Sequence, residues 1–317
     1  MDPAVTTLDR LDGWQAVGVI SPAQHQVLSA IVRKERCSVY LELSALLYLG
    51  VLLFAGGVGW TFREYVDNLG DGAIITALTL MVAAAFYYCF ATAEPYDSDE
   101  TESPNMAFDY VLYLGCLLLS AEVAYLQYRF EIFRSWHHHL LIGTVVFGLL
   151  AYRFDNRFVL SMALSSLAAW LGLRIDDFTG TSSDALRVTA LFYGALIIGI
   201  GTLLHRENIK AHFLEVYLHL GANVILMAAA SGLGEPSMGL AYLAALVALS
   251  AAAIMLGVRF RRFAFVAYGI LYGYGGISYK LLAAVGEPLV ALWYFVFTGT
   301  FVIGLLVVLA RRFGRDE

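Results

Sequence analysis

Long runs of apolar residues, separated by short polar segments, fill the chain from about residue 39 to about residue 310. These runs show neither strand-like alternation nor the spacing of amphipathic surface helices, so they are typical of membrane spans. Hydrophobic residues make up 60% of the 317 residues and charged residues only 15%, whereas roughly a quarter of a soluble domain is charged. The pattern predicts an all-α fold, a polytopic transmembrane helical bundle.

The apolar runs also predict how many helices cross the bilayer. About 20 apolar residues are needed to span roughly 30 Å of hydrocarbon. By this measure we expect about ten spans, at residues 39–60, 72–93, 108–128, 137–153, 157–173, 186–204, 211–230, 238–258, 262–284 and 289–310. The fourth and fifth are short and joined by a tight turn, so a re-entrant pair that leaves eight full spans is the alternative.

The basic residues are distributed unevenly between the two sets of loops. With ten spans, 14 of the 20 Lys and Arg residues fall on the side that carries both termini. Since positive residues in short loops mark the cytoplasmic side, both termini are expected in the cytoplasm and the protein in a bacterial inner membrane. The first apolar run follows a charged segment, so we expect it to be kept as an anchor rather than cleaved as a signal.

Three regions are expected along the chain. Residues 1–37 should form a cytoplasmic helical pair, residues 38–311 the transmembrane helical domain and residues 312–317 a cytoplasmic tail. The sequence of residues 47–53 recurs, with one difference, at residues 112–118. This echo suggests that the first and third spans belong to a duplicated two-helix unit.

The N-terminal pair carries local helix signals. Thr6 or Thr7 is expected to cap the first helix, and Gly18 to end it in the left-handed conformation that glycine tolerates. Ser21 and Gln24 have the spacing of a capping box, which predicts the start of a second helix.

The longest interhelical loop, at about residues 94–107, contains five acidic residues between positions 94 and 102 together with two prolines. One interpretation is a flexible solvated linker. The alternative is a docking site for a basic partner.

The first part of the chain resembles a domain-of-unknown-function family of uncharacterised bacterial multi-pass membrane proteins, which begin with a short helical segment. The residues that carry the resemblance are Leu11, Gly18, Val19, Ile20, Ser21, Gln24, Tyr48, Leu49, Gly50, Gly56, Gly57 and Trp60. It extends to about residue 130. The resemblance implies a multi-pass architecture and carries no activity.

The seventh span contains the best candidate for a polar site: His212, Glu215, His219 and Asn223. At 100° per residue these side chains fall within an arc of about 80° on one helix face. Polar groups in a bilayer are costly and often functional. The stripe is therefore interpreted either as a proton or cation path, as a set of metal ligands, or as polar contacts to the membrane interface and to neighbouring helices.

Two further sets of residues are secondary candidates. Glu122 is a lone carboxylate within the third span, expected to be protonated there, and Lys280 near the outer end of the ninth span is its hypothetical partner. A solvated cleft is the alternative position for Glu122. Three tyrosines of the ninth span, Tyr268, Tyr272 and Tyr279, are expected either to line a ligand cavity or to bond across helices.

The glycines of the ninth span support two different expectations. Gly269, Gly273 and Gly276 form a small-residue seam that permits close helix contact. The consecutive Gly275 and Gly276 are instead expected to break the helix if the span forms a transporter site.

Three consecutive histidines, His137, His138 and His139, open the fourth span on the outer side. Adjacent helical residues diverge by 100°, so the three imidazoles cannot face one ion. An interfacial position is expected, with a periplasmic pH sensor as the alternative.

No nucleotide-binding loop, metalloprotease motif or nucleophile elbow is present in the sequence, so no cofactor is predicted and enzymatic activity is not expected. A net charge of −6 argues against nucleic acid as a partner. We expect a protein that contacts membrane lipids and transports a small solute or ion. The alternatives are a scaffold or sensor that docks a cytoplasmic protein through residues 1–37, and a metal-dependent lipid-modifying enzyme that uses His212, Glu215 and His219.

Overall fold

A computed structural model describes residues 3–19, some isolated residues between 21 and 60, and residues 70–313. Within the last range, residues 102, 134, 136 and 180–182 are not described. The chain divides into two compact units, residues 1–74 and residues 75–317. The predicted domain boundary at residue 37 and most of the first predicted span lie outside the described residues.

The first unit begins with helix α1 (Pro3–Ala16), which starts earlier than predicted, so Thr6 and Thr7 lie inside the helix and do not cap it. Gly18 ends the helix with a φ of 78°, as predicted. The capping box is also confirmed, because Ser21 N donates to Gln24 Oε1 at 2.8 Å and Gln24 N donates to Ser21 Oγ at 3.3 Å.

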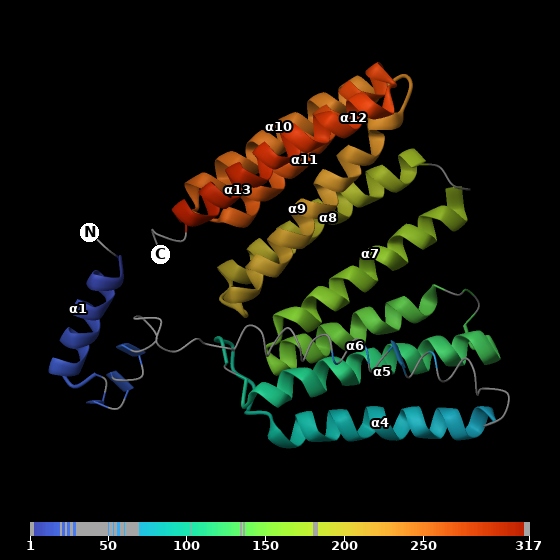
Figure 1. The fold of residues 1–317 in the computed structure, drawn as a ribbon. Coiled ribbons are helices and arrows are strands. Elements are labelled where there is room, and N and C mark those ends of the chain that lie inside the picture. Colours follow the sequence, from blue (N-terminus) through green and yellow to red (C-terminus); the bar gives the residue numbers. More distant parts are fainter. Residues whose placement is uncertain are drawn as a thin grey trace. The chain divides into compact units, whose positions relative to one another are not determined.

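Helices follow one another through the rest of the chain (Figure 1). Their bounds are α4 (Asp71–Thr92), α5 (Met106–Phe130), α6 (His138–Phe154), α7 (Arg157–Thr179), α8 (Ser183–Arg206), the 3₁₀ turn η1 (Ala211–Phe213), α9 (Leu214–Ser231), the 3₁₀ turn η2 (Gly232–Gly234), α10 (Gly239–Arg259), α11 (Phe263–Val285), α12 (Pro288–Tyr294), the π-helical turn η3 (Phe295–Gly299) and α13 (Thr300–Phe313). A helix is found at the position of each predicted span from the second to the tenth, with its ends shifted by a few residues. The all-helical, polytopic prediction is confirmed.

Among the residues that the structure describes, seven helical segments are long and apolar enough to cross a membrane. Helix α7 meets this criterion over Arg157–Ile175, which favours a full crossing over the re-entrant alternative. Helix α6 is shorter, with 17 residues. Helix α11 has 23 residues and does not meet the combined criterion of length and hydropathy.

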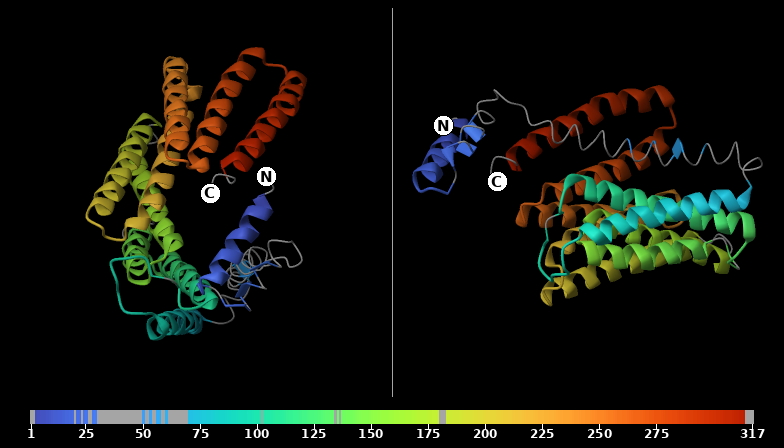
Figure 2. Two further views of the ribbon diagram at one scale, coloured as in Figure 1. Left: turned by 90° about the vertical axis from the view of Figure 1, so that its left-hand side faces the viewer. Right: turned by 90° about the horizontal axis from the view of Figure 1, so that it is seen from below.

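The transmembrane helices are arranged as antiparallel hairpins that follow the order of the sequence. Helices α6 and α7, α8 and α9, and α10 and α11 form the closest pairs, and each pair then contacts the next. Figure 1 shows this succession from α4 at the bottom to α10, α11 and α13 at the top, and Figure 2 shows it from two other sides. Loops that were assigned to one side of the membrane are therefore gathered at one end of the helices.

Small residues bring the helices of these hairpins close together. A Cβ atom added to Gly194 of α8 would lie 2.9 Å from the carbonyl oxygen of Gly221 in α9, and one added to Gly221 would lie 2.8 Å from that of Gly194. A Cβ atom on Gly269 would lie 2.4 Å from the carbonyl oxygen of Ser250 in α10. The predicted seam of α11 is thus confirmed as a contact with α10.

Helix α11 runs without interruption from Phe263 to Val285, so the predicted break at Gly275 and Gly276 was wrong. The reason is local packing, since a Cβ atom on Gly276 would lie 2.5 Å from Leu246 of α10. Gly276 permits close contact with α10 and does not loosen the helix.

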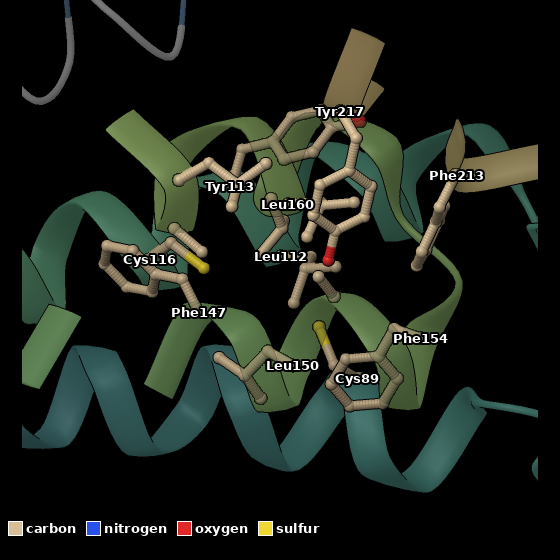
Figure 3. Packing of buried hydrophobic residues seen from close by; sticks show 14 of the residues in the cluster. Cys89, Leu112, Tyr113, Cys116, Phe147, Leu150, Phe154, Leu160, Phe213 and Tyr217 are labelled. Carbon is tan, nitrogen blue, oxygen red and sulfur yellow. The ribbon is translucent and has the colours of Figure 1, made fainter. Parts of the chain in front are cut away.

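A large buried cluster joins α4, α5, α6, α7, α8 and the start of α9 (Figure 3). Its aromatic rings meet edge to face, as in the pair Phe108 and Phe154, whose centroids are 5.6 Å apart. Tyr152 and Tyr217 place their hydroxyl oxygens 2.9 Å apart inside it. This cluster fixes the position at which α9 begins, and therefore the position of the polar residues of α9.

Candidate functional site

The predicted stripe of four polar residues does not extend to its first member. His212 belongs to η1, which precedes α9, and its Nε2 atom hydrogen-bonds to Oδ1 of Asp155 in the turn between α6 and α7. The chain enters α9 through this 3₁₀ turn, directly after Lys210 in the left-handed conformation. The spacing of 100° per residue therefore does not relate His212 to the residues of α9. Of the four residues, only Glu215, His219 and Asn223 share a face of α9.

That face meets α11 in three successive polar pairs, which we call the polar seam. The pairs are Glu215–Arg262, His219–Tyr268 and Asn223–Tyr272, with side-chain atoms 3.2, 3.3 and 3.4 Å apart. The second and third pairs have the same offset of 49 residues, because α9 and α11 run parallel in register. Tyr268 and Tyr272 thus bond across helices, one of the two roles predicted for them.

The imidazole of His219 is held on two sides. Its ring stacks on that of Phe265 with centroids 4.9 Å apart, and its Nδ1 atom faces the hydroxyl of Tyr268. Asn223 Nδ2 donates to the carbonyl oxygen of His219 at 2.8 Å. Glu215, His219 and Asn223 are each four residues apart on α9, so they lie one helical turn apart on the same face.

A cavity of about 450 Å³ lies at the end of the polar seam, between η2 and the second half of α11. Tyr272 lines this cavity and also donates to Asn223, so the last pair of the seam borders the cavity. Ser231 and Tyr279 also line it. Tyr279 therefore takes the other role predicted for these tyrosines, as part of a cavity wall.

A buried charge cluster lies at the end of the helices where α9 begins. The carboxylate of Asp155 accepts from Lys210 Nζ at 2.9 Å, from Thr101 N at 2.6 Å and from His212. The side chains of Asp155 and Lys210 are only 4% and 2% exposed. Nothing in the sequence pattern indicated Asp155 or Lys210, because each occupies a short turn between spans.

The acidic loop at residues 94–107 packs against these turns. This contact bears on both interpretations of the loop, the flexible solvated linker and the docking site for a basic partner. Lys210 Nζ donates to the carbonyl oxygen of Asp99 at 2.8 Å, and Arg157 Nη2 donates to Glu100 at 2.6 Å. Arg153 Nη1 donates to the carbonyl oxygen of Glu94 at 3.0 Å. The basic groups that contact this loop belong to the same chain.

Glu122 and Lys280 lie on helices that are not neighbours, and their hypothetical pairing is not formed. Glu122 on α5 is 9% exposed, and its Oε1 atom lies 2.5 Å from the hydroxyl oxygen of Thr79 on α4. Lys280 on α11 instead lies beside Gly239 at the start of α10. The α4–α5 contact thus provides the partner of Glu122.

An ion pair lies at the opposite end of the helices from the buried charge cluster. Arg187 of α8 is 9% exposed and donates to Glu235 and to Asp184, each at 2.7 Å. Its guanidinium carbon lies 5.3 Å from the ring centroid of Tyr242. These contacts join α8 to the turn before α10.

We expect the Arg187–Glu235 pair to make the stability of the folded protein depend on pH in the acidic range. The hydrogen bond and the charge of Arg187 hold the pKa of the Glu235 carboxyl below its ordinary value, with a smaller lowering from Ser183 and an opposing rise from burial. Since the pKa is lower in the folded state, the pair stabilises the protein above the ordinary carboxyl pKa, and this contribution is lost as the pH falls through the depressed pKa. Melting temperatures across pH should show a smaller acid-induced drop for Glu235→Gln, and identical profiles would contradict the assignment.

The histidines of α6 do not gather around one point. His137 is buried and stacks on His138 with centroids 4.9 Å apart, while His139 lines a separate cavity of about 310 Å³ between α5, α6 and α7. In the part of the chain that the structure describes, no group of three or more His, Cys, Asp or Glu side chains is arranged to hold a metal ion. His212 and His219 face different helices, so they do not form the predicted metal set with Glu215.

Comparison with known proteins identifies a matching family. Residues 12–160 match the model of the family described as "Predicted membrane protein (DUF2157)". No curated protein and no solved structure matches the chain. The matched segment includes Glu122 and Asp155 but ends before the polar seam. Together with its apolar helices, the match confirms the expected resemblance: this is an integral membrane protein whose residues 12–160 have the sequence of that family of predicted membrane proteins.

Proposed function

We propose that the protein conducts protons across a bacterial inner membrane along the polar seam between α9 and α11. The observation that carries the proposal is the in-register series of polar pairs that begins at Glu215 and ends at the cavity beside Tyr272. Polar groups inside a span are costly, so the two pairs within the helices, His219–Tyr268 and Asn223–Tyr272, support a role beyond packing.

The chemistry of the seam suits a proton better than a larger solute. Imidazole and phenol groups both donate and accept hydrogen bonds, so His219 and Tyr268 can receive a proton on one side and release one on the other. Successive members are four residues apart on α9, a rise of about 6 Å that one bridging water can span. A larger solute would have to separate α9 from α11.

The two ends of the path have different characters. Glu215 interacts with Arg157 and Arg262 at the end that carries most of the basic residues, which we place in the cytoplasm by the distribution of positive charge. At the other end, the hydroxyls of Ser231 and Tyr279 border a cavity large enough for several waters. We therefore assign the cavity to the outer side as the mouth of the path.

Proton flux into liposomes tests this proposal. Purified protein is reconstituted with a pH-sensitive dye inside the vesicles, and a potassium diffusion potential drives proton entry. His219→Leu is expected to lower the flux about tenfold or more, equivalent to a barrier increase of about 1.4 kcal/mol or more. His219→Gln, which keeps polarity but cannot hold a proton near neutral pH, should lower it similarly.

His139→Leu is the matched control, because it removes an imidazole from α6, away from the seam, and should leave the flux unchanged. Wild-type vesicles that are no more permeable to protons than empty ones would contradict the proposal, as would equal flux in the wild type and His219→Leu. Deletion of residues 1–37 addresses the docking alternative. A proton path should keep working without them, whereas a docking module should lose its partner.

A further inference from the structure

Four exposed arginines lie at the end of the helices where α11 begins. Two come from the end of α10 and the turn that follows it, and two from the last turn of α13: Arg259, Arg261, Arg311 and Arg312. The ring centroids of Phe263 at the start of α11 and Phe313 at the end of α13 are 6.0 Å apart, so both pairs of arginines lie at the same end of neighbouring helices (Figure 1). We call these four residues the arginine patch.

Among the described residues, the arginine patch has no carboxylate partner. The sequence contains no Asp or Glu between positions 235 and 287 or between positions 287 and 316, so the helices that carry the patch supply none. The adjoining Arg262 pairs with Glu215 of α9 at 3.2 Å, and that carboxylate also faces Arg157 at 3.5 Å. The patch therefore has four positive charges that the described part of the chain does not neutralise.

The arginine patch lies where two apolar segments end. Arg259 is the last residue of the candidate span Gly239–Arg259, and the other pair lies in the last turn of the candidate span Leu289–Phe313. Guanidinium groups at the end of a span extend to the level of the lipid headgroups. Phe260, next to Arg259, is 62% exposed, so an aromatic ring beside the charges is free to enter the apolar part of a lipid.

Helix α13 offers an uncovered apolar surface beside the arginine patch. Within the described structure, no residue of the most apolar part of its span is buried. Phe301, Ile303 and Val308 are among its exposed side chains. A positive end next to a long apolar surface is complementary to a negative headgroup with acyl chains, whereas a soluble anion would use only the charges.

We infer that the arginine patch binds the phosphate headgroup of an anionic phospholipid whose acyl chains lie along α13. A guanidinium can donate two parallel hydrogen bonds to phosphate oxygens, and arginines from two elements can hold one headgroup from two sides. A zwitterionic lipid has a cationic group beside its phosphate, so it should bind more weakly. The site does not rest on the proposed proton path, because it uses no residue of the polar seam.

Native mass spectrometry of the full-length protein in detergent, with equal amounts of phosphatidylglycerol and phosphatidylcholine, tests the site. The wild type should carry phosphatidylglycerol in preference to phosphatidylcholine. Because each arginine near an anionic headgroup raises the affinity about fivefold, Arg259→Gln combined with Arg311→Gln should lower phosphatidylglycerol binding roughly 20-fold. Both side chains are exposed, so the variant should fold normally.

Arg153→Gln combined with Arg206→Gln is the matched control, because it removes two positive charges at the same end of the helices but outside the patch. This variant should bind phosphatidylglycerol like the wild type. Equal losses in the two double variants would show that binding follows total charge, and the inference would be overturned. A wild type without preference for phosphatidylglycerol would overturn it as well.

Two further measurements separate a lipid site from other anion sites. Excess inorganic phosphate should not displace phosphatidylglycerol from the wild type, and complete displacement would overturn the assignment to a lipid. A phosphatidylglycerol analogue with a photoreactive headgroup should crosslink to the peptides that contain the arginine patch. Crosslinks confined to other peptides would place the lipid elsewhere and overturn the site.

Discussion

Replacing Asp155 by asparagine is expected to lower the free energy of unfolding by about 3–5 kcal/mol, the range found when one partner of a buried ion pair is removed. The side chain of Lys210 is 2% exposed, and its ammonium would lose the carboxylate with which it pairs. Asparagine is the appropriate replacement because residue 155 has a φ of 55°, a left-handed conformation that asparagine also adopts. The backbone of the turn is therefore preserved and the charge alone is removed.

Thermal or denaturant unfolding in detergent measures this effect. Glu100→Gln is the control, since Glu100 pairs with Arg157 in a contact that is 60% and 45% exposed and should contribute less than about 1 kcal/mol. Adding Lys210→Met to Asp155→Asn should restore part of the lost stability, because no charge is then left buried. If Asp155→Asn behaves like Glu100→Gln, the buried charge cluster does not stabilise the fold.

Adding a single methyl group to Gly221 is the second change with a large expected effect. The Cβ atom of Gly221→Ala would lie 2.5 Å from Ile198 and 2.8 Å from the carbonyl oxygen of Gly194, so α8 and α9 would have to separate. Overpacking of this kind typically costs about 1–3 kcal/mol, and a clash with backbone belongs at the upper end of that range. The fraction of monodisperse protein that remains after heating measures the loss.

Gly199→Ala provides the matched control on the same hairpin. A Cβ atom at Gly199 has no neighbour within 4 Å, so this variant should be neutral or more stable by up to about 1 kcal/mol through its higher helix propensity. Equal melting behaviour of Gly221→Ala and Gly199→Ala would show that α8 and α9 do not pack through glycine.

The features that were predictable from the sequence depend on local chemistry. Helix ends follow from the length of each apolar run, and the capping box of Ser21 and Gln24 follows from three-residue spacing. A close helix contact at Gly269 was predictable because small residues on one helix face permit it, and the structure shows that the contact is with α10. Each of these predictions rests on the residue types found within a few turns of one segment.

The features that were not predictable depend on which helix faces meet. His219 and Tyr268 are 49 residues apart and come together only because α10 returns the chain to the starting end of α9. Asp155 and Lys210 are 55 residues apart in separate turns, and neither residue is unusual in a loop. The error at His212 arose from the short 3₁₀ turn before α9, whose different pitch no periodicity analysis detects.

The hairpin arrangement described above also has a consequence for biosynthesis. Because each pair of helices meets mainly its neighbours in sequence, most contacts are available to the nascent chain as soon as the second helix of a pair has left the ribosome. The chain can then assemble from its N-terminal side onward, two helices at a time, without waiting for its C-terminus. The late-made α11 then supplies the partner face for the polar residues of α9.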